Sequence, residues 1–302
     1  MTTAARKRFR ELLAAPEVLI LPGAYDALSA RIIESAGFDA VTAGGNSGIG
    51  SMLAEPDIGQ SNLRDYADHY ARICGAVTVP VTVDGDTGFG DVNNVRHMVR
   101  AFEAAGVAAF FINDQVFPQR CGYLPGTQVT PVEDMLAKIK AAVDARRDES
   151  LLIGARTDAA AVLGLNEAID RACLFIEAGA DIAKPQCVDR PEDIARVVRE
   201  VPSPHITTLS QAAGTHKSDI ADRAALGVSA ISLPSIALFA ATAAVKRALT
   251  TLKRENALGA VAADLLPLEE YYELTGLHAL MAREKGYQEA ARRLVTKAAQ
   301  KH

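Results

Sequence analysis

Eight short apolar segments alternate with longer amphipathic segments along this 302-residue chain. The apolar segments are nearly continuous hydrophobic runs, as expected of parallel strands that are buried on both faces. Glycines follow several amphipathic segments, where helices commonly end before the next strand. Eight strand–helix repeats favour an α/β fold closed into a (β/α)8 barrel of the TIM type over an open sheet. The predicted strands lie within residues 17–23, 39–45, 80–86, 108–115, 151–159, 180–186, 204–211 and 229–235.

The chain continues past the eighth repeat with a helical segment that a barrel does not need. We therefore predict a catalytic barrel domain over residues 1–250 and a C-terminal helical extension over residues 251–302. An amphipathic extension that follows a closed barrel needs a surface on which to bury its apolar side.

Composition excludes several classes of protein. The net charge is −5 without blocks of like charge, which argues against nucleic acid as a main partner. Apolar stretches end well short of the ~20 residues that a membrane span needs, and residues 1–26 have no signal-peptide pattern. The four cysteines lie far apart without a CxxC pair, so we expect a reducing cytoplasm and no disulfide scaffold.

Polar residues follow six of the predicted strands, at the end of a barrel where active sites lie. Asp84 and Asp86 are two residues apart on a segment that we expect to be extended, so both carboxylates would point to one side. Two such carboxylates repel unless a cation or a proton lies between them, and Mg²⁺ prefers oxygen ligands. Asp57 is a third acid on the second strand–helix loop. The alternative is an ordinary loop start with an aspartate cap.

Two further residues could carry chemistry. Arg156 ends the fifth predicted strand, where a guanidinium can bind a carboxylate, although a structural pair with Asp158 would explain it as well. Cys121 lies in the loop after the fourth strand, and its neighbours Arg120 and Gly122 make a reactive thiolate plausible. A lone cysteine is more often inert. The glycines of residues 43–46 offer backbone N–H groups for an anion, and the six histidines show no metal-ligand spacing.

Taken together, "LPGAYDALSARIIESAGFDAV", "EPDIG", "DGDTGFG", "DQVFPQRCG", "ARTDA" and "EAGAD" closely resemble the isocitrate lyase/phosphoenolpyruvate mutase superfamily over residues 21–234. The "RCG" loop is similar to that of the methylisocitrate lyase and dimethylmalate lyase branch. The resemblance implies a (β/α)8 barrel whose last helix is swapped between subunits, with the C-terminal extension packed on a neighbouring subunit. It also implies a cytoplasmic homotetramer built as a dimer of dimers.

The reaction implied by the resemblance is cleavage of a carbon–carbon bond in a 2-hydroxy dicarboxylate, such as a substituted malate or a methylisocitrate-like acid. The products would be a 2-oxo acid and an enolate that becomes a carboxylic acid. Mg²⁺, or Mn²⁺ in its place, would hold the 2-oxo acid part. Cys121 would protonate the enolate, and its loop would close over the substrate to exclude water.

The resemblance also assigns roles to individual residues. Arg156 and Cys121 match catalytic positions. Asp84 and Asp86 match the metal-site aspartates, Asp57 matches an acid behind them, and Asn113 takes the place of a metal-site glutamate. The expected substrate contacts are Ala43, Gly44, Gly45, Asp84, Gly122, Tyr123, Arg156, Gln186, Thr208 and Ser210.

Several of these positions depart from the family pattern. Asn113, Gln186 and Gln211 replace acids, Gln119 replaces a lysine, and Phe239 stands where an arginine is expected. An amide cannot act as a base and adds no charge to a cation site, although its carbonyl can still bind a cation. We therefore expect weaker metal binding and a substrate smaller or less charged than methylisocitrate. Two alternatives remain: an oxaloacetate decarboxylase or phosphonopyruvate-type hydrolase or mutase, and a catalytically weakened paralogue that binds an oxo-acid.

Overall fold

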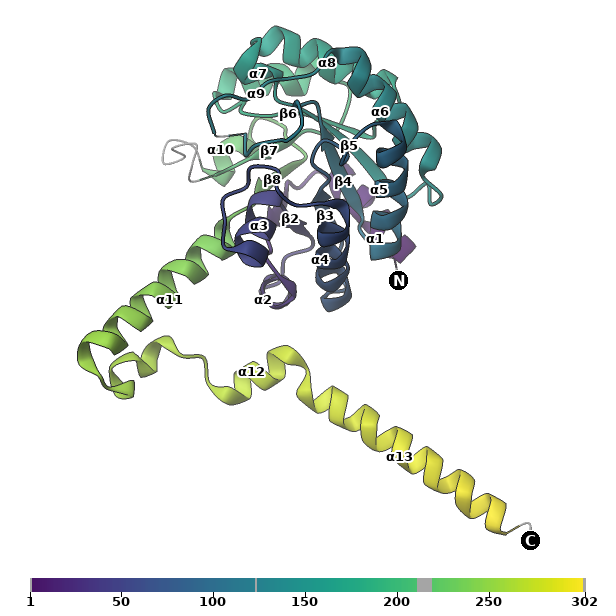
Figure 1. The fold of residues 1–302 in the computed structure, drawn as a ribbon, viewed down its shortest axis with the longest axis vertical. Coiled ribbons are helices and arrows are strands. Elements are labelled where there is room, and N and C mark those ends of the chain that lie inside the picture. Colours follow the sequence, from purple (N-terminus) through teal and green to yellow (C-terminus); the bar gives the residue numbers. More distant parts are fainter. Residues whose placement is uncertain (1, 123, 211–218, 301–302) are drawn as a thin grey trace. The chain divides into compact units, whose positions relative to one another are not determined.

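The computed structural model describes residues 2–122, 124–210 and 219–300, and in them strands and helices alternate as the sequence predicts (Figure 1). The chain forms two compact units, Met1–Ala241 and Thr242–His302. The predicted boundary at residue 250 lies within helix α11, Ile236–Glu255, which begins in the first unit and continues into the second. No helix in the described ranges is both long and apolar enough to cross a membrane.

The eight strands pair in parallel. Five are hydrogen-bonded in the order β2-β3-β4-β5-β6 and three in the order β1-β8-β7. An isolated parallel bridge between Gly23 and Thr42 joins β1 to β2, so the two groups are continuous there. The strands are β1 (Leu19–Pro22), β2 (Val41–Ala43), β3 (Val81–Asp84), β4 (Ala109–Asn113), β5 (Leu152–Thr157), β6 (Ile182–Pro185), β7 (Ile206–Thr208) and β8 (Ala230–Leu233).

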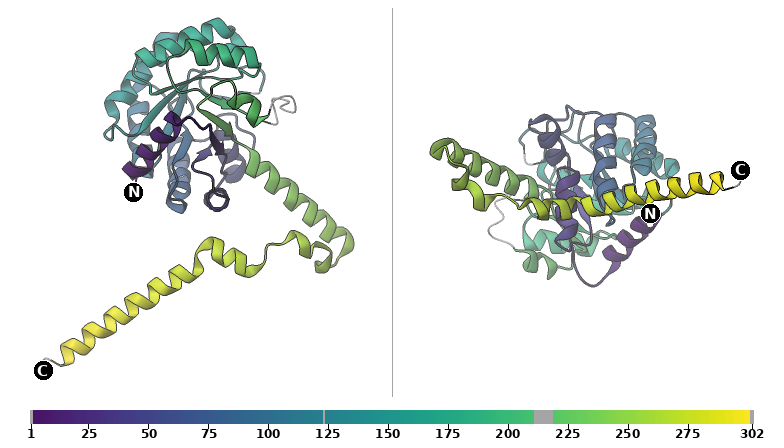
Figure 2. Two further views of the ribbon diagram at one scale, coloured as in Figure 1. Left: turned by 180° about the vertical axis from the view of Figure 1, so that it is seen from behind. Right: turned by 90° about the horizontal axis from the view of Figure 1, so that it is seen from below.

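Helices flank the strands on their outer side (Figures 1 and 2). Several begin at an aspartate or asparagine whose side chain accepts a hydrogen bond from the first turn, as Asp26, Asn62 and Asp91 do. The helices are α1 (Thr2–Ala14), α2 (Ala27–Ser35), α3 (Gly45–Leu53), α4 (Leu63–Ala76), α5 (Val92–Ala105), α6 (Val132–Ala145), α7 (Ala159–Val162), α8 (Leu165–Glu177), α9 (Pro191–Glu200) and α10 (Ile220–Ala224).

Alternate residues of each strand face opposite sides of the sheet, and both sides are buried. One set, which includes Leu21, Leu152 and Ile182, forms an inner core, whereas their neighbours pack against the helices. This two-sided burial is why the strands are hydrophobic runs and do not alternate with polar residues. The strands are parallel, so their carboxyl ends and the loops that follow lie at one end of the unit.

Helix α3 was not predicted from the sequence. Helix α3 begins directly after β2, although its sequence, GNSGIGSML, contains three glycines and has a poor intrinsic helix preference. Burial explains the difference, because Ile49 is fully buried and Ser47 Oγ donates a 2.7 Å hydrogen bond to the Pro234 carbonyl. Tertiary contacts therefore stabilise a helix that local preference does not favour.

The second unit contains the rest of α11, the 3-10 helix η3 (Leu258–Asp264), α12 (Leu268–Thr275) and α13 (Leu277–Ala299). Neither α12 nor α13 has a buried residue. Large apolar side chains are exposed along α13, including Leu280, Leu294 and Val295. An isolated soluble chain rarely leaves such a series of apolar side chains in water.

Candidate active site

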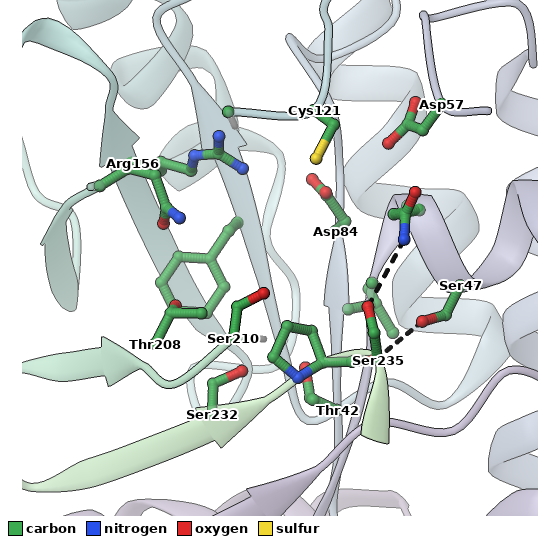
Figure 3. A pocket seen from close by; sticks show the side chains of 18 of the residues that line it. Thr42, Ser47, Asp57, Asp84, Cys121, Arg156, Thr208, Ser210, Ser232 and Ser235 are labelled. Atoms are coloured by element: carbon green, nitrogen blue, oxygen red, sulfur yellow. Dashed lines mark hydrogen bonds between the residues drawn. The ribbon is translucent and has the colours of Figure 1, made fainter. Parts of the chain in front are cut away.

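A cavity of about 150 Å³ lies at the carboxyl ends of the strands in the first unit (Figure 3). Its wall is formed by the last inward-facing residues of the strands and by the loops that follow β2, β4 and β8. One side is acidic, whereas another is formed by Arg156, Lys184 and several hydroxyl groups.

The acidic side contains Asp57 and Asp84. A Cβ atom on Gly45 would lie 2.9 Å from Asp57 Oδ2 and 3.2 Å from Asp84 Oδ2, so both carboxylates approach the same backbone atom. Burial, together with the Asp84 charge, raises the pKa of Asp57 to about 6. Asp57 Oδ1 is buried and has no hydrogen-bond partner among the described residues. Such a carboxylate is suited to a cation or to a polar ligand.

Asp86 does not continue the strand, which corrects the expectation of an extended segment. Its φ angle is +48°, and its carboxylate is buried behind the cavity instead of lining it beside Asp84. The amide of Gln119 donates to Asp86 Oδ1 and accepts from the Asn113 amide. Burial and the charges of Asp84 and Asp57 raise the pKa of Asp86 well above its ordinary value.

The contact between Asn113 and Gln119 also corrects the charge argument. In the family pattern Asn113 replaces an acid and Gln119 replaces a lysine, so each substitution alone would change the charge of the site. In the structure these two amides are hydrogen-bonded to each other, so their charge changes cancel within one contact. The local charge is therefore less altered than the sequence suggested.

Arg156 is the last inward-facing residue of β5. Its Nη2 donates a 2.7 Å hydrogen bond to Asp158 Oδ1, so the structural pair that the sequence left open is present. The same guanidinium also lines the cavity, and its Nε has no hydrogen-bond partner among the described residues. Asp158 and Asp84 raise the pKa of Arg156 despite its burial. Arg156 therefore remains charged and has a donor available for a ligand.

The loop that carries Cys121 is fixed at two points. The side chain of Gln115 accepts from the Arg120 N–H at 2.9 Å and donates to the Arg120 carbonyl at 3.0 Å. The Cys121 N–H donates to the Asp57 carbonyl at 3.3 Å. Figure 3 shows the Cys121 sulfur and the Asp84 carboxylate turned toward each other. The thiol therefore faces the cavity and is not packed in the hydrophobic core.

Gly122 and the glycines after β2 allow backbone to approach the charged groups. A Cβ atom on Gly122 would lie 2.7 Å from Arg156 Nη2, which no larger residue could avoid without displacing the guanidinium. Gly44 and Gly45 form the start of α3, where the first N–H groups of a helix have no intrahelical partner. This helix start lines the cavity and suits a carboxylate.

The structure places most predicted site residues together. Gly44, Gly45, Asp57, Asp84, Cys121, Gly122, Arg156, Gln186, Thr208 and Ser210 all line the cavity. Ala43 is in the hydrophobic core, and Asp86 and Asn113 lie behind the wall. Tyr123 and Gln211 lie outside the described residues.

Sequence analysis assigned no role to Lys184 or Phe111. Lys184 lines the cavity from β6, beside Arg156 in the β5–β6 register. Its Nζ lies 5.7 Å from the centre of the Phe111 ring. Burial, with the neighbouring Arg156 charge, lowers the pKa of Lys184 to about 8. The signal in the sequence was the lysine inside an otherwise apolar predicted strand.

The acidic side fits a magnesium ion. No group of three His, Cys, Asp or Glu side chains within residues 2–122, 124–210 and 219–300 is arranged as a metal cage. Mg²⁺ does not need such a cage, because it commonly binds one or two carboxylates and takes water and substrate oxygens as its other ligands. Asp84 and Asp57, which approach each other and whose mutual repulsion a cation would relieve, meet this requirement.

A parallel strand–helix unit with a polar cavity at the strand ends defines the class of an α/β enzyme of the barrel type. The profile of the phosphoenolpyruvate phosphomutase family matches residues 9–253, and the chain belongs to this family, within the isocitrate lyase/PEP mutase superfamily. The chain is 35% identical to 2,3-dimethylmalate lyase of Eubacterium barkeri, covering 95% of this chain and 99% of that protein. It is also 35% identical to 2-methylisocitrate lyase of Aeropyrum pernix, with 95% and 92% covered.

Solved structures agree with these relatives. Oxaloacetate acetylhydrolase in complex with 3,3-difluorooxalacetate superimposes with a TM-score of 0.89 at 28% identity, covering 95% of this chain and 98% of that chain. 2,3-Dimethylmalate lyase gives 0.88 at 29%, with 95% of each chain covered. Phosphonopyruvate hydrolase with oxalate and Mg²⁺ gives 0.84 at 29%, with 94% and 99% covered. The family prediction is confirmed, and the protein is an enzyme of the carbon–carbon lyase type.

Proposed function

We propose that this protein is a Mg²⁺-dependent lyase that cleaves the carbon–carbon bond of a 2-hydroxy dicarboxylate. The observation that supports this most strongly is one cavity lined by Cys121, Arg156 and the Asp57–Asp84 pair. A bond cleavage of this kind needs an anion site for the 2-oxo acid and a proton donor for the departing fragment. These residues supply both. Mn²⁺ is the alternative metal, because it takes the same oxygen ligands.

In the proposed reaction the first carboxylate and the 2-oxygen bind to Arg156 and to the start of α3. A base removes the hydroxyl proton, the carbon–carbon bond breaks as the carbonyl of the 2-oxo acid forms, and its electron pair remains on the departing fragment as an enolate. The Cys121 thiol then gives its proton to the enolate carbon. Asp84 and Asp57 would hold Mg²⁺, which would supply a positive charge for the oxygens of the 2-oxo acid. The loop that Gln115 fixes keeps water from the enolate.

A second candidate is hydrolysis of the carbon–carbon bond of oxaloacetate, which the likeness to oxaloacetate acetylhydrolase favours. The two candidates give different products from different substrates. Hydrolysis releases a second carboxylic acid, whereas the lyase releases a 2-oxo acid. Decarboxylation or phosphonate chemistry would leave Cys121 without a role.

The test is a panel of 2-hydroxy and 2-oxo dicarboxylates incubated with Mg²⁺, followed by detection of pyruvate, glyoxylate and oxalate. Cys121→Ser should lower kcat by about 100-fold or more, because a positioned proton donor contributes on this order. Oxalate binding, measured by calorimetry, should stay within threefold. Cys173→Ser, in helix α8, is the matched control and should leave kcat unchanged. Near-wild-type turnover by Cys121→Ser would refute the protonation step.

We also propose how the barrel closes and how the subunits assemble. Closure of the (β/α)8 barrel requires β6 to approach β7, and Ala183 N–H already donates to the side chain of Ser203, which precedes β7. The exposed apolar residues of α11 and α13 support a swapped last helix and an extension, residues 251–302, that packs on a neighbouring subunit. A homotetramer built as a dimer of dimers, in the cytoplasm, is the assembly that we propose.

A further inference from the structure

Lys184 is a buried cation to which the proposed reaction assigns no role. It is an inward-facing residue of β6, between Ile182 of the inner core and Gln186 at the cavity rim. Among the described residues its ammonium group has no hydrogen bond and no ion pair, and it lies over the Phe111 ring. A buried lysine without an acidic partner is costly, because burial disfavours its charge.

Phe111 and Gly154 support the Lys184 side chain at the cavity wall. A Cβ atom on Gly154 would lie 2.4 Å from two Phe111 ring atoms, so only glycine leaves room for this ring. The ring then lies beneath the Lys184 ammonium, at a separation where a cation–π contact is effective. The ring supports the stem of the lysine while leaving the donors of its ammonium group available.

A second group on the same side also has no partner. Thr208, the last residue of β7, lines the cavity, and its hydroxyl is buried without a hydrogen bond among the described residues. Figure 3 shows Thr208 together with Ser210 and Ser232 in the part of the wall away from Asp57. A buried donor without a partner usually marks an absent water or ligand.

We propose that Lys184 and Thr208 bind the second carboxylate of the substrate, while Arg156 binds the first. This inference rests on the proposed function and explains how the enzyme would select a substrate with two carboxylates. The acidic side of the cavity repels a second carboxylate, so the distal one must turn toward the only other buried cation that lines the described wall. Arg156 is already paired with Asp158, whereas Lys184 forms no ion pair among the described residues. The substrate is therefore a dianion with two separated carboxylates.

The test compares a long and a short probe. Malate and 2,3-dimethylmalate carry two carboxylates separated by two carbon atoms, whereas the two carboxylates of oxalate are bonded directly to each other. Affinities are measured by calorimetry with Mg²⁺ for the wild type, Lys184→Met, Lys184→Arg and Thr208→Val. Lys140→Met, an exposed lysine of α6, is the matched control.

Lys184→Met should weaken the dicarboxylates about 10- to 100-fold, as expected when a charge-assisted hydrogen bond is lost. Oxalate should change by less than about threefold, and Lys184→Arg should restore most of the dicarboxylate affinity. Thr208→Val should give a smaller loss in the same direction, about 3- to 10-fold. Lys140→Met should match the wild type.

Two results would overturn the proposal: unchanged dicarboxylate affinity in Lys184→Met, or an equal loss for oxalate. The two proposals fail separately. If the binding pattern holds but no dicarboxylate is cleaved, the lyase function is wrong and the carboxylate site stands. If cleavage occurs but Lys184→Met binds normally, only the carboxylate site is wrong.

Discussion

At the scale of single residues, the site depends on carboxylates that are buried close together. Asp57 and Asp84 approach Gly45 from two elements, and Asp86 lies behind them. Burial and repulsion between neighbouring carboxylates favour the protonated forms of Asp57 and Asp86, which is opposite to the usual effect of folding on an exposed acid. A cation would relieve this repulsion. The free energy of unfolding should therefore depend on pH and on bound metal. A substitution of one carboxylate should remove its share of that dependence.

Asp57→Asn should remove the pH-dependent loss of folding stability that comes from ionising the buried Asp57 carboxyl group. Folding raises the pKa of Asp57 from 3.8 to about 6, so the folded state binds more protons than the unfolded state between these values. The contribution of Asp57 to stability is therefore lost as pH rises from about 4 to about 6, by on the order of 3 kcal/mol at full effect. Metal-free wild type should lose stability relative to Asp57→Asn across this window.

Urea unfolding of both proteins at pH 4.5, 5.5, 6.5 and 7.5 measures this difference. Added Mg²⁺ should stabilise the wild type more at pH 7.5 than at pH 4.5, and Asp57→Asn less at either pH. A stability difference between the two proteins that is the same at every pH would mean that Asp57 is not perturbed by folding.

At the scale of elements, two short segments bring the reactive groups together. Helix α3 starts against the carboxylates, and the loop between β4 and α6 carries Cys121 over the cavity. Each is held by contacts that are distant in sequence. Ser47 in α3 bonds to Pro234, and Gln115 bonds to Arg120 across the loop. Changes in these supports should therefore affect the site without removing a reactive group.

Gly45→Ala should disturb the acidic side through one added methyl group. The new Cβ would lie 2.9 Å from Asp57 Oδ2 and 3.2 Å from Asp84 Oδ2, so the carboxylates must move. We expect Mg²⁺-dependent oxalate affinity to fall at least about tenfold and stability to fall by about 1–3 kcal/mol. Gly75→Ala, in α4 with no atom within 4 Å, is the control and should be neutral or slightly stabilising. Equal oxalate affinities in the two variants would contradict the steric argument.

Gln115→Ala should loosen the Cys121 loop. The side chain of Gln115 makes two hydrogen bonds to the backbone of Arg120, and both would be lost. Trypsin cleavage after Arg120 should become about tenfold faster, as expected for a local loss of 1–2 kcal/mol. Gln128→Ala, an exposed residue of the same loop, is the control. The prediction is wrong if both variants are cleaved at the wild-type rate, measured by mass spectrometry.

At the scale of the whole molecule, the two compact units differ in how they satisfy the hydrophobic effect. The first buries a core between strands and helices, whereas α12 and α13 contain no fully buried residue. The apolar residues of α13 therefore need a surface that a single chain does not offer. A second copy of the chain is the partner that we propose.

Leu294→Glu should weaken this assembly. Leu294 is 71% exposed in α13, so a charge there would cost nothing in a monomer but would be buried in an interface. We expect the wild type to have a mass several times 32.0 kDa by light scattering, and the variant to dissociate at micromolar concentration. Gln288→Glu, in the same helix, should remain assembled. A monomeric wild type would refute the assembly.

The sequence by itself determined the eight strand–helix repeats and the end of the unit where polar residues gather, because burial on both faces and helix stops leave a local pattern. It also predicted ten of the residues that line the cavity, including Cys121 and Arg156. Only the tertiary structure decided that α3 is helical, that Asp86 turns behind the cavity, that Asn113 and Gln119 are one contact, and that Lys184 has no ion pair with any described residue. These four features depend on contacts between residues that are distant in sequence, and a local sequence pattern carries no information about such contacts.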